Sequence, residues 1–160
     1  MTEAPTTQLV SVSFGLAGQQ YARITVTHAG TRQAEMSLLW GSLLLTLTTE
    51  AQVENLKLAW FSAVPLVRAL PANLGSLAVL SGIDPGMQQP GVVLRMHGEA
   101  AHWTVEHLPA RYAQRRRVAH EHVMIRFGRL GWQVFDRRAH HDTMSILKRI
   151  SKLSPAAFGD

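Results

Sequence analysis

The sequence of 160 residues predicts one α+β domain made of two ββββα units, residues 9–70 and 91–154, joined by residues 71–90. Two observations carry this prediction. A Gly-x pair stands between apolar residues twice, at Trp40-Gly41-Ser42-Leu43 and at Phe127-Gly128-Arg129-Leu130, with a separation of 87 residues. The same separation relates Thr49 to Asp136, two residues that favour helix N-termini, so turn, strand and helix keep one spacing in both units.

Four segments of the first unit alternate apolar and polar residues or flank the glycine turn, and we expect them to be strands: Val10–Phe14, Ala22–Thr27, Glu35–Trp40 and Leu43–Thr48. In the Gly41-Ser42 turn, glycine supplies the positive φ that a two-residue hairpin loop requires. Such a short loop places Trp40 opposite Leu43. Thr49, followed three residues later by Gln52, predicts the start of the first helix.

The second unit repeats this order after a connection rich in proline and glycine. Its expected strands are Val92–His97, His102–Leu108, Val123–Phe127 and Leu130–Phe135. The segment Arg111–Arg117 is too charged to be buried and is expected to be a connection, while Asp136 caps the second helix. The prediction is therefore two antiparallel four-stranded sheets, each backed by a helix.

Composition excludes several classes of protein. The chain has no cysteine, which rules out disulfides, thiolate metal sites and a cysteine nucleophile. No apolar stretch reads as a signal peptide or membrane span, so a cytoplasmic location without a membrane partner is expected. Neither a Gly-x-Ser-x-Gly elbow nor a glycine-rich phosphate loop is present, so we expect no enzyme activity.

Histidines are the remaining candidates for a metal site. His120-Glu121-His122 places two imidazoles on one strand face, and His140-His141-Asp142 is able to approach it in space. The spacing matches no known ligand motif. We therefore expect neither a metal nor a cofactor, and keep a histidine-metal enzyme or small-ligand binder as the third alternative.

Charge is divided unequally between the two units. Residues 1–90 hold four Lys/Arg against five acidic residues, whereas residues 91–160 hold twelve against six and seven of the eight histidines. A basic half favours an anionic partner such as nucleic acid. The alternative is a solvated basic face without a partner.

The apolar face of the second hairpin also defines an outer face, because side chains alternate across a strand. We expect this face to be basic and polar with one aromatic ring, at Arg95, His97, His120, His122, Met124, Arg126, Gln133 and Phe135. Further cations of the same surface are Arg115, Arg116, Arg117 and Arg137. Basic groups bind phosphates and aromatic rings stack on bases, the combination that single-strand binders use. The alternative for Phe135 is a contact beneath the Arg111–Arg117 connection.

The tandem ββββα order resembles the Whirly and PUR-repeat class of single-stranded nucleic-acid-binding proteins, and the single unit resembles the domain of the positive-cofactor transcriptional coactivators. The resemblance covers Val10 to Leu153 and rests on element order, since the lysine-glycine-rich strand motif of plant Whirly proteins is missing. It implies a ligand on outer strand positions, here Arg95, His97, His122, Met124, Arg126, Gln133 and Phe135.

The sequence thus predicts a non-catalytic protein that binds single-stranded DNA or RNA on the basic outer sheet face of the second unit. A protein–protein interaction or assembly module is the alternative. Its contact surfaces would be the nearly neutral first sheet and the apolar Leu77–Leu80 segment, and a homo-oligomer is compatible with either function.

Overall fold

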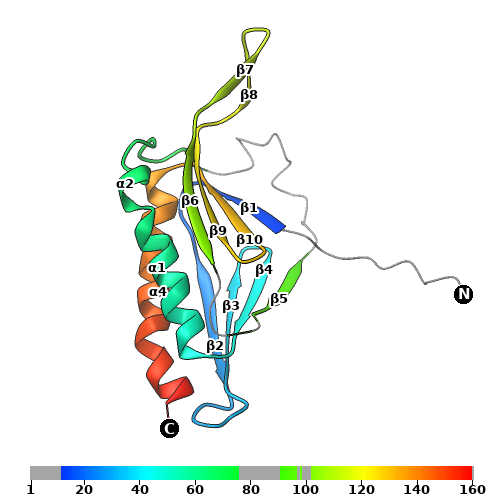
Figure 1. The fold of residues 1–160 in the computed structure, drawn as a ribbon, viewed down its shortest axis with the longest axis vertical. Coiled ribbons are helices and arrows are strands. Elements are labelled where there is room, and N and C mark those ends of the chain that lie inside the picture. The colour runs from blue at the N-terminus through cyan, green and yellow to red at the C-terminus, as the bar shows by residue number, and fades with distance from the viewer. Residues whose placement is uncertain (1–11, 76–90, 97, 99–101, 160) are drawn as a thin grey trace, which may run out of the picture.

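The computed structural model describes residues 12–75, 91–96, 98 and 102–159 (Figure 1). Its strands and helices are β1 (Val12–Leu16), β2 (Ala22–Thr27), β3 (Glu35–Trp40), β4 (Leu43–Leu47), α1 (Glu50–Ser62), α2 (Val64–Val67), β5 (Val92–Arg95), β6 (Trp103–Leu108), β7 (Arg111–Ala113), β8 (Arg116–Ala119), β9 (His122–Phe127), β10 (Leu130–Val134) and α4 (Arg137–Phe158). Two four-stranded sheets and two long helices confirm the α+β class.

The order of the sheets differs from the prediction. One sheet runs β1-β10-β9-β6 and the other β2-β3-β4-β5, so each contains one strand from the opposite half of the chain. Both incoming strands are parallel to their neighbours, β1 to β10 and β5 to β4, and the sheets are mixed and not antiparallel. The alternation of apolar and polar residues indicates which face of a strand is buried, but it does not indicate which edge of a sheet the strand joins. In Figure 1 the blue β1 lies beside β10, and the green β5 beside β4.

Strands β1 and β5, the crossing strands, each join the sheet of the opposite half of the chain and pair with their parallel neighbours in the same register. Val12 lies opposite Leu130, and Val92 lies opposite Leu43. The first hydrogen bond of each parallel pair is also equivalent, because Val12 N donates to Arg129 O at 2.9 Å and Val92 N to Ser42 O at 2.8 Å. The two acceptor residues, Arg129 and Ser42, are 87 residues apart in the sequence. The paired residues Leu130 and Leu43 have the same separation.

The predicted hairpins and helix starts are confirmed. Trp40 pairs with Leu43, and Phe127 with Leu130, across turns in which Gly41 and Gly128 have φ of 58° and 59°. The Thr49 hydroxyl accepts a hydrogen bond from Gln52 N, and the Asp136 carboxylate accepts one from Ala139 N. A side-chain oxygen that binds a free amide of the first turn stabilises the start of a helix.

Helices α1 and α4 lie side by side and antiparallel along one side of the sheets (Figure 1). Each packs on strands of the opposite half, α1 on β6 and β9 and α4 on β2 and β3. Three buried indoles meet in the core: the ring of Trp132 is stacked with that of Trp40 at 5.7 Å and edge-on to that of Trp60 at 5.6 Å. These large aromatic rings join both sheets and α1 in one hydrophobic core.

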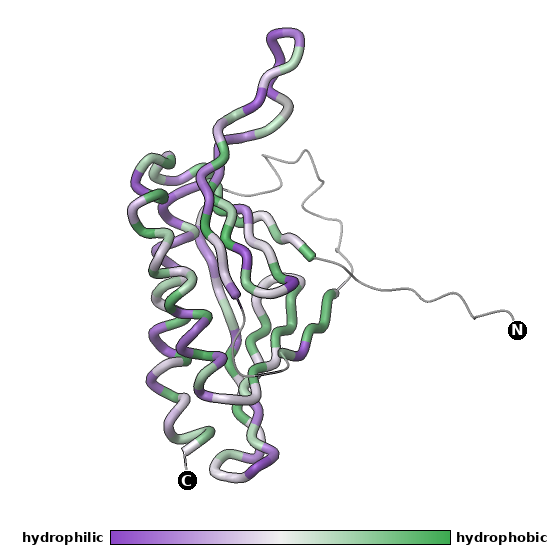
Figure 2. Tube along the Cα trace, in the orientation of Figure 1, coloured by the Kyte–Doolittle hydropathy of each residue, from purple (hydrophilic) through white to green (hydrophobic). Residues whose placement is uncertain are grey.

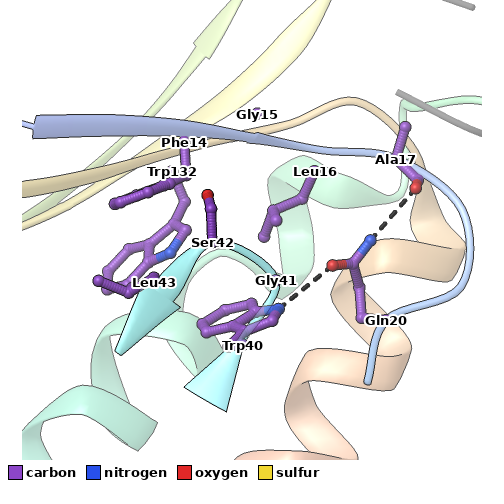
Figure 3. A pocket seen from close by; sticks show the side chains of 10 residues that line it. All are labelled: Phe14, Gly15, Leu16, Ala17, Gln20, Trp40, Gly41, Ser42, Leu43 and Trp132. Atoms are coloured by element: carbon purple, nitrogen blue, oxygen red, sulfur yellow. Dashed lines mark hydrogen bonds between the residues drawn. The ribbon is translucent and has the colours of Figure 1, made fainter. Parts of the chain in front are cut away.

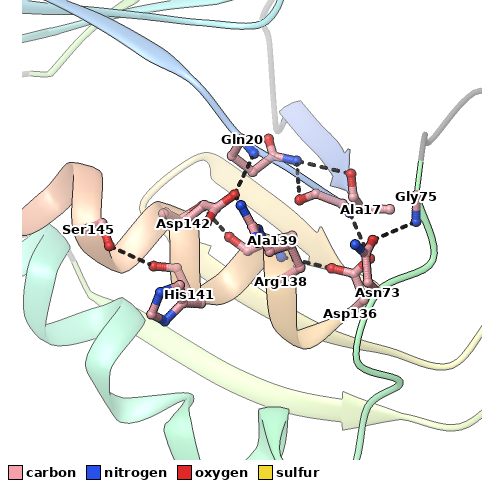
Figure 4. Close-up of polar contacts among 12 residues, drawn as sticks. Ala17, Gln20, Asn73, Gly75, Asp136, Arg138, Ala139, His141, Asp142 and Ser145 are labelled. Carbon is pink, nitrogen blue, oxygen red and sulfur yellow. Dashed lines mark hydrogen bonds and ion pairs between the residues drawn. The ribbon is translucent and has the colours of Figure 1, made fainter.

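Asp136 connects the start of α4 to two distant segments (Figure 4). Its fully buried carboxylate accepts hydrogen bonds from Gly18 N and Leu74 N, both at 2.7 Å, as well as from Ala139 N at 2.8 Å. Gly18 has a φ of 69°, and a Cβ at this position would lie 2.3 Å from Gly75 O. The loop after β1 is therefore tied to the second half of the chain, which places β1 along β10.

Candidate nucleic-acid interface

The hairpin of β7 and β8 projects beyond both sheets and both long helices (Figure 1). We call residues 111–119 the arm. The sequence predicts a charged connection here, and the structure folds it into a two-stranded ribbon in which Tyr112 pairs with Arg117 and Ala113 with Arg116. Every residue from 111 to 117 is exposed, and Figure 2 shows hydrophilic residues around the tip.

The arm combines cations with one aromatic ring. Four of its residues are arginines, none is acidic, and none forms an ion pair with a carboxylate of the described residues. The guanidinium carbon of Arg117 lies 5.9 Å from the ring centre of Tyr112, which is 62% exposed. Arg117 also donates to Nδ1 of His120 at 3.2 Å. The arm therefore offers positive charge and a flat ring directly to solvent.

The turn of the arm has unusual residues for its backbone. Gln114 and Arg115 have φ of 51° and 65°, and two positive values in a two-residue loop define a hairpin turn that normally carries Asn-Gly. An L-residue with a side chain in this conformation costs about 1–2 kcal/mol. Arg115 accordingly adds a cation to the tip at some cost in backbone strain.

Phe135 is not the open stacking surface that the sequence predicts. Its ring is only 9% exposed and lies 5.5 Å from the ring of His122 and 6.2 Å from that of His120. Met124 and His122 are also buried, and Gln133 is half-buried. The alternative, a contact of Phe135 below the charged connection, fits better because His120 directly follows the arm.

The outer face of the β1-β10-β9-β6 sheet is also less cationic than expected. Arg126 is exposed, opposite Thr104 in β6 and Gly131 in β10. Glu106, which sequence analysis missed, lies opposite Met124 on the same face. The alternation of side chains in the predicted strand His102–Leu108 already places Glu106 on the outer face, so the sequence contained a signal for this residue. Among the described residues of these four strands, one arginine and one glutamate thus share the outer face.

Three predicted site residues lie elsewhere or outside the described chain. Arg95 belongs to β5 in the other sheet, where its guanidinium forms an ion pair with Glu35, so it does not share a face with Arg126. The cause is the unexpected pairing of β5 with β4. His97 lies outside the described residues. Arg137 is exposed in the first turn of α4.

Two hollows of the described surface are candidates for a binding role. One, of about 230 Å³, opens between β1 and the β3–β4 turn and is lined by Phe14, Trp40 and Trp132 among others (Figure 3). The Gln20 side chain crosses its edge, donating to Ala17 O and accepting from Trp40 Nε1. None of the residues that line it is titratable, so this hollow has no group for acid–base chemistry.

The second hollow, of about 290 Å³, lies between the end of α1, α2 and the start of α4, and we call it the α2–α4 groove. Its lining includes Phe61, Arg68, Arg137, His141, Met144 and Lys148. His140 also lines it and is buried: burial lowers the pKa of this imidazole, whose Nε2 donates to Trp60 O at 2.9 Å. The His140 ring is therefore neutral near pH 7, and the charge of the groove comes from its arginines and lysine.

Comparison with protein-family models, with curated proteins and with solved structures finds no match for this chain. Within the described residues, no group of three or more His, Cys, Asp or Glu side chains is placed to hold a metal ion. In the same part of the chain, no helix is both long and apolar enough to cross a membrane. The arm and the α2–α4 groove are two basic features of the described surface.

Proposed function

We propose that this protein binds single-stranded DNA or RNA through the arm and catalyses no reaction. The observation that carries the proposal is the projecting ribbon with four arginines, one exposed tyrosine and no acidic residue. Arginines bind phosphates through charge and paired N–H donors, and an exposed ring stacks on unpaired bases of any sequence. The formal net charge of +5 attracts a polyanion from a distance.

The equal register of the crossing strands supports a tandem ββββα repeat of the Whirly or PUR-repeat kind, in which the two units exchange their first strands. In this interpretation β6 of the second unit corresponds to β2 of the first unit, and β9 corresponds to β3. The connection between β2 and β3 spans only residues 28–34, so the arm is an addition to the second unit. An addition that is both basic and exposed fits a binding function better than a role in the core.

Fluorescence anisotropy with a labelled oligothymidine strand, and with a duplex of the same length, tests the proposal. The parent should bind the single strand more tightly, and Tyr112→Ala should lose about 1–3 kcal/mol of binding free energy through the lost stacking. Tyr21→Ala is the matched control, because Tyr21 is 70% exposed but lies outside the arm. Equal affinities of the two variants, tighter duplex binding, or no binding below millimolar concentration near physiological salt would each reject it.

An assembly module is the second candidate, and a row of apolar side chains favours it. Leu39, Leu44 and Val93 lie side by side across β3, β4 and β5 on the outer face of their sheet, and Val93 is 71% exposed. Exposed apolar rows occur at contacts between proteins. A lower mass of Val93→Asp than of the parent in sedimentation analysis would support contact between copies, and a monomeric parent would exclude it.

A further inference from the structure

We propose that the α2–α4 groove seats a nucleotide, with its phosphate on Arg137 and its base against Phe61. The inference deepens the proposed function, since the nucleotide is either free or part of the strand that the arm holds. Three features of the groove support it: cations that form no ion pair within the described part of the chain, an exposed aromatic ring beside buried apolar side chains, and a position close to the foot of the arm.

Among the described residues, the cations of the groove have no partner of opposite charge. Arg68, Arg137 and Lys148 line it, and none forms an ion pair with a carboxylate of the described residues. Arg138, next to Arg137, is different because its Nε lies 3.0 Å from the carboxylate of Asp142. Like charges around one hollow repel each other, and an anion between them removes that repulsion.

Arg137 is also unfavourably placed in its helix. It lies in the first turn of α4, where the helix dipole disfavours a cation. The amides of this turn are already used: Arg137 N donates to Pro71 O, Arg138 N to Ala72 O and Ala139 N to Asp136. An anion in the groove is therefore bound by side chains and not by the end of the helix.

The apolar part of the groove favours a ligand with a flat ring. Phe61 is 62% exposed, while Val67 and Met144 in the same lining are buried. A volume of about 290 Å³ is close to the lower end of small-molecule sites, roughly 300–1,000 Å³. Guanidinium groups bind phosphate in a bidentate manner, and a base stacks on phenylalanine, so a nucleotide uses both parts of the lining.

The groove lies near the foot of the arm. Arg137 is two residues from Phe135, whose ring contacts His120, the residue that follows β8. In Figure 1 the arm, α2 and the start of α4 lie at the same end of the molecule. A strand held by the arm is therefore able to place one nucleotide in the groove.

Calorimetric titration with adenosine monophosphate, adenosine and inorganic phosphate tests the inference. The monophosphate should bind at least about tenfold more tightly than either part, because both halves of the lining contribute. Arg137→Gln should weaken its binding by at least about tenfold, the lower limit for a charge-assisted hydrogen bond, whereas the matched control Arg138→Gln should leave it within about twofold. Phe61→Ala should weaken binding of the monophosphate but not of phosphate, and Leu58→Ala, one turn earlier in α1, should weaken neither.

Two results would overturn the inference: no preference for the monophosphate over phosphate, or equal effects of Arg137→Gln and Arg138→Gln. Tyr112→Ala separates the two proposals. If this variant binds the monophosphate normally while the parent binds no oligonucleotide, the groove takes a free nucleotide and the arm proposal fails. If oligonucleotide binding requires Tyr112 but the monophosphate does not bind, the groove proposal fails alone.

Discussion

Replacement of Asp136 by alanine should be among the most destabilising single changes outside the hydrophobic core. The carboxylate is fully buried and accepts three backbone N–H groups, from Gly18, Leu74 and Ala139. Loss of an N-cap costs about 1 kcal/mol, and each buried amide left without an acceptor costs about 1–3 kcal/mol. The free energy of unfolding should therefore fall by roughly 3–7 kcal/mol, which lowers the melting temperature by roughly 6–28 °C for a chain of this size.

Thr49→Ala is the matched control, since Thr49 caps α1 with a single bond, from Gln52 N at 3.2 Å. It should lose about 1 kcal/mol. Asp136→Asn separates the two effects: asparagine caps a helix as well as aspartate but has one oxygen, so the bonds to Gly18 and Leu74 should be lost while the cap remains. Thermal and urea unfolding followed by circular dichroism measure all three variants. A loss in Asp136→Ala no larger than in Thr49→Ala would refute the role of Asp136 as a junction.

Two further predictions concern the core. Trp132→Ala should lower the free energy of unfolding by roughly 3–5 kcal/mol, because Trp132 is fully buried between Trp40 and Trp60; a melting temperature within about a degree of the parent would contradict this. His140→Gln should reduce the loss of stability with falling pH. Burial keeps the native pKa of His140 below its ordinary value of 6.5, so the stability it contributes is complete above that value and is lost as the pH falls towards the native pKa. Urea unfolding at about pH 7 and pH 5 measures the difference, and an unchanged pH dependence in the variant would contradict it.

The parts of the fold that depend on local chemistry could be predicted from the sequence. A glycine with positive φ between apolar strands specifies the register of each hairpin, and the caps at Thr49 and Asp136 follow from their side chains. The exchange of β1 and β5 between the sheets could not be predicted, because a strand has the same period-two alternation whichever edge of a sheet it joins. That long-range choice depends on contacts such as Gly18 with Asp136, which have no local pattern.

The candidate site, like the fold, could be predicted from the sequence only in part. The sequence was sufficient to predict that Arg115, Arg116 and Arg117 are charged and exposed. It was not sufficient to predict the hairpin of β7 and β8 that carries them, because Gln114-Arg115 is not a usual sequence for a hairpin turn. Alternation placed Phe135 on the outer side of its strand but gave no information on the histidine rings that cover it. The α2–α4 groove joins residues far apart in sequence, which no spacing along the chain indicates.

The salt dependence of single-strand binding tests the role of the arm most directly. The double variant R116Q/R117Q removes two exposed charges from the arm, and R23Q/R32Q removes two exposed charges from the first half of the chain. Each lost phosphate contact should lower the slope of log affinity against log salt by about 0.7 for a single strand. We expect a slope lower by up to about 1.4 in R116Q/R117Q and nearly unchanged in R23Q/R32Q. Equal slopes in the two variants would contradict binding through the arm.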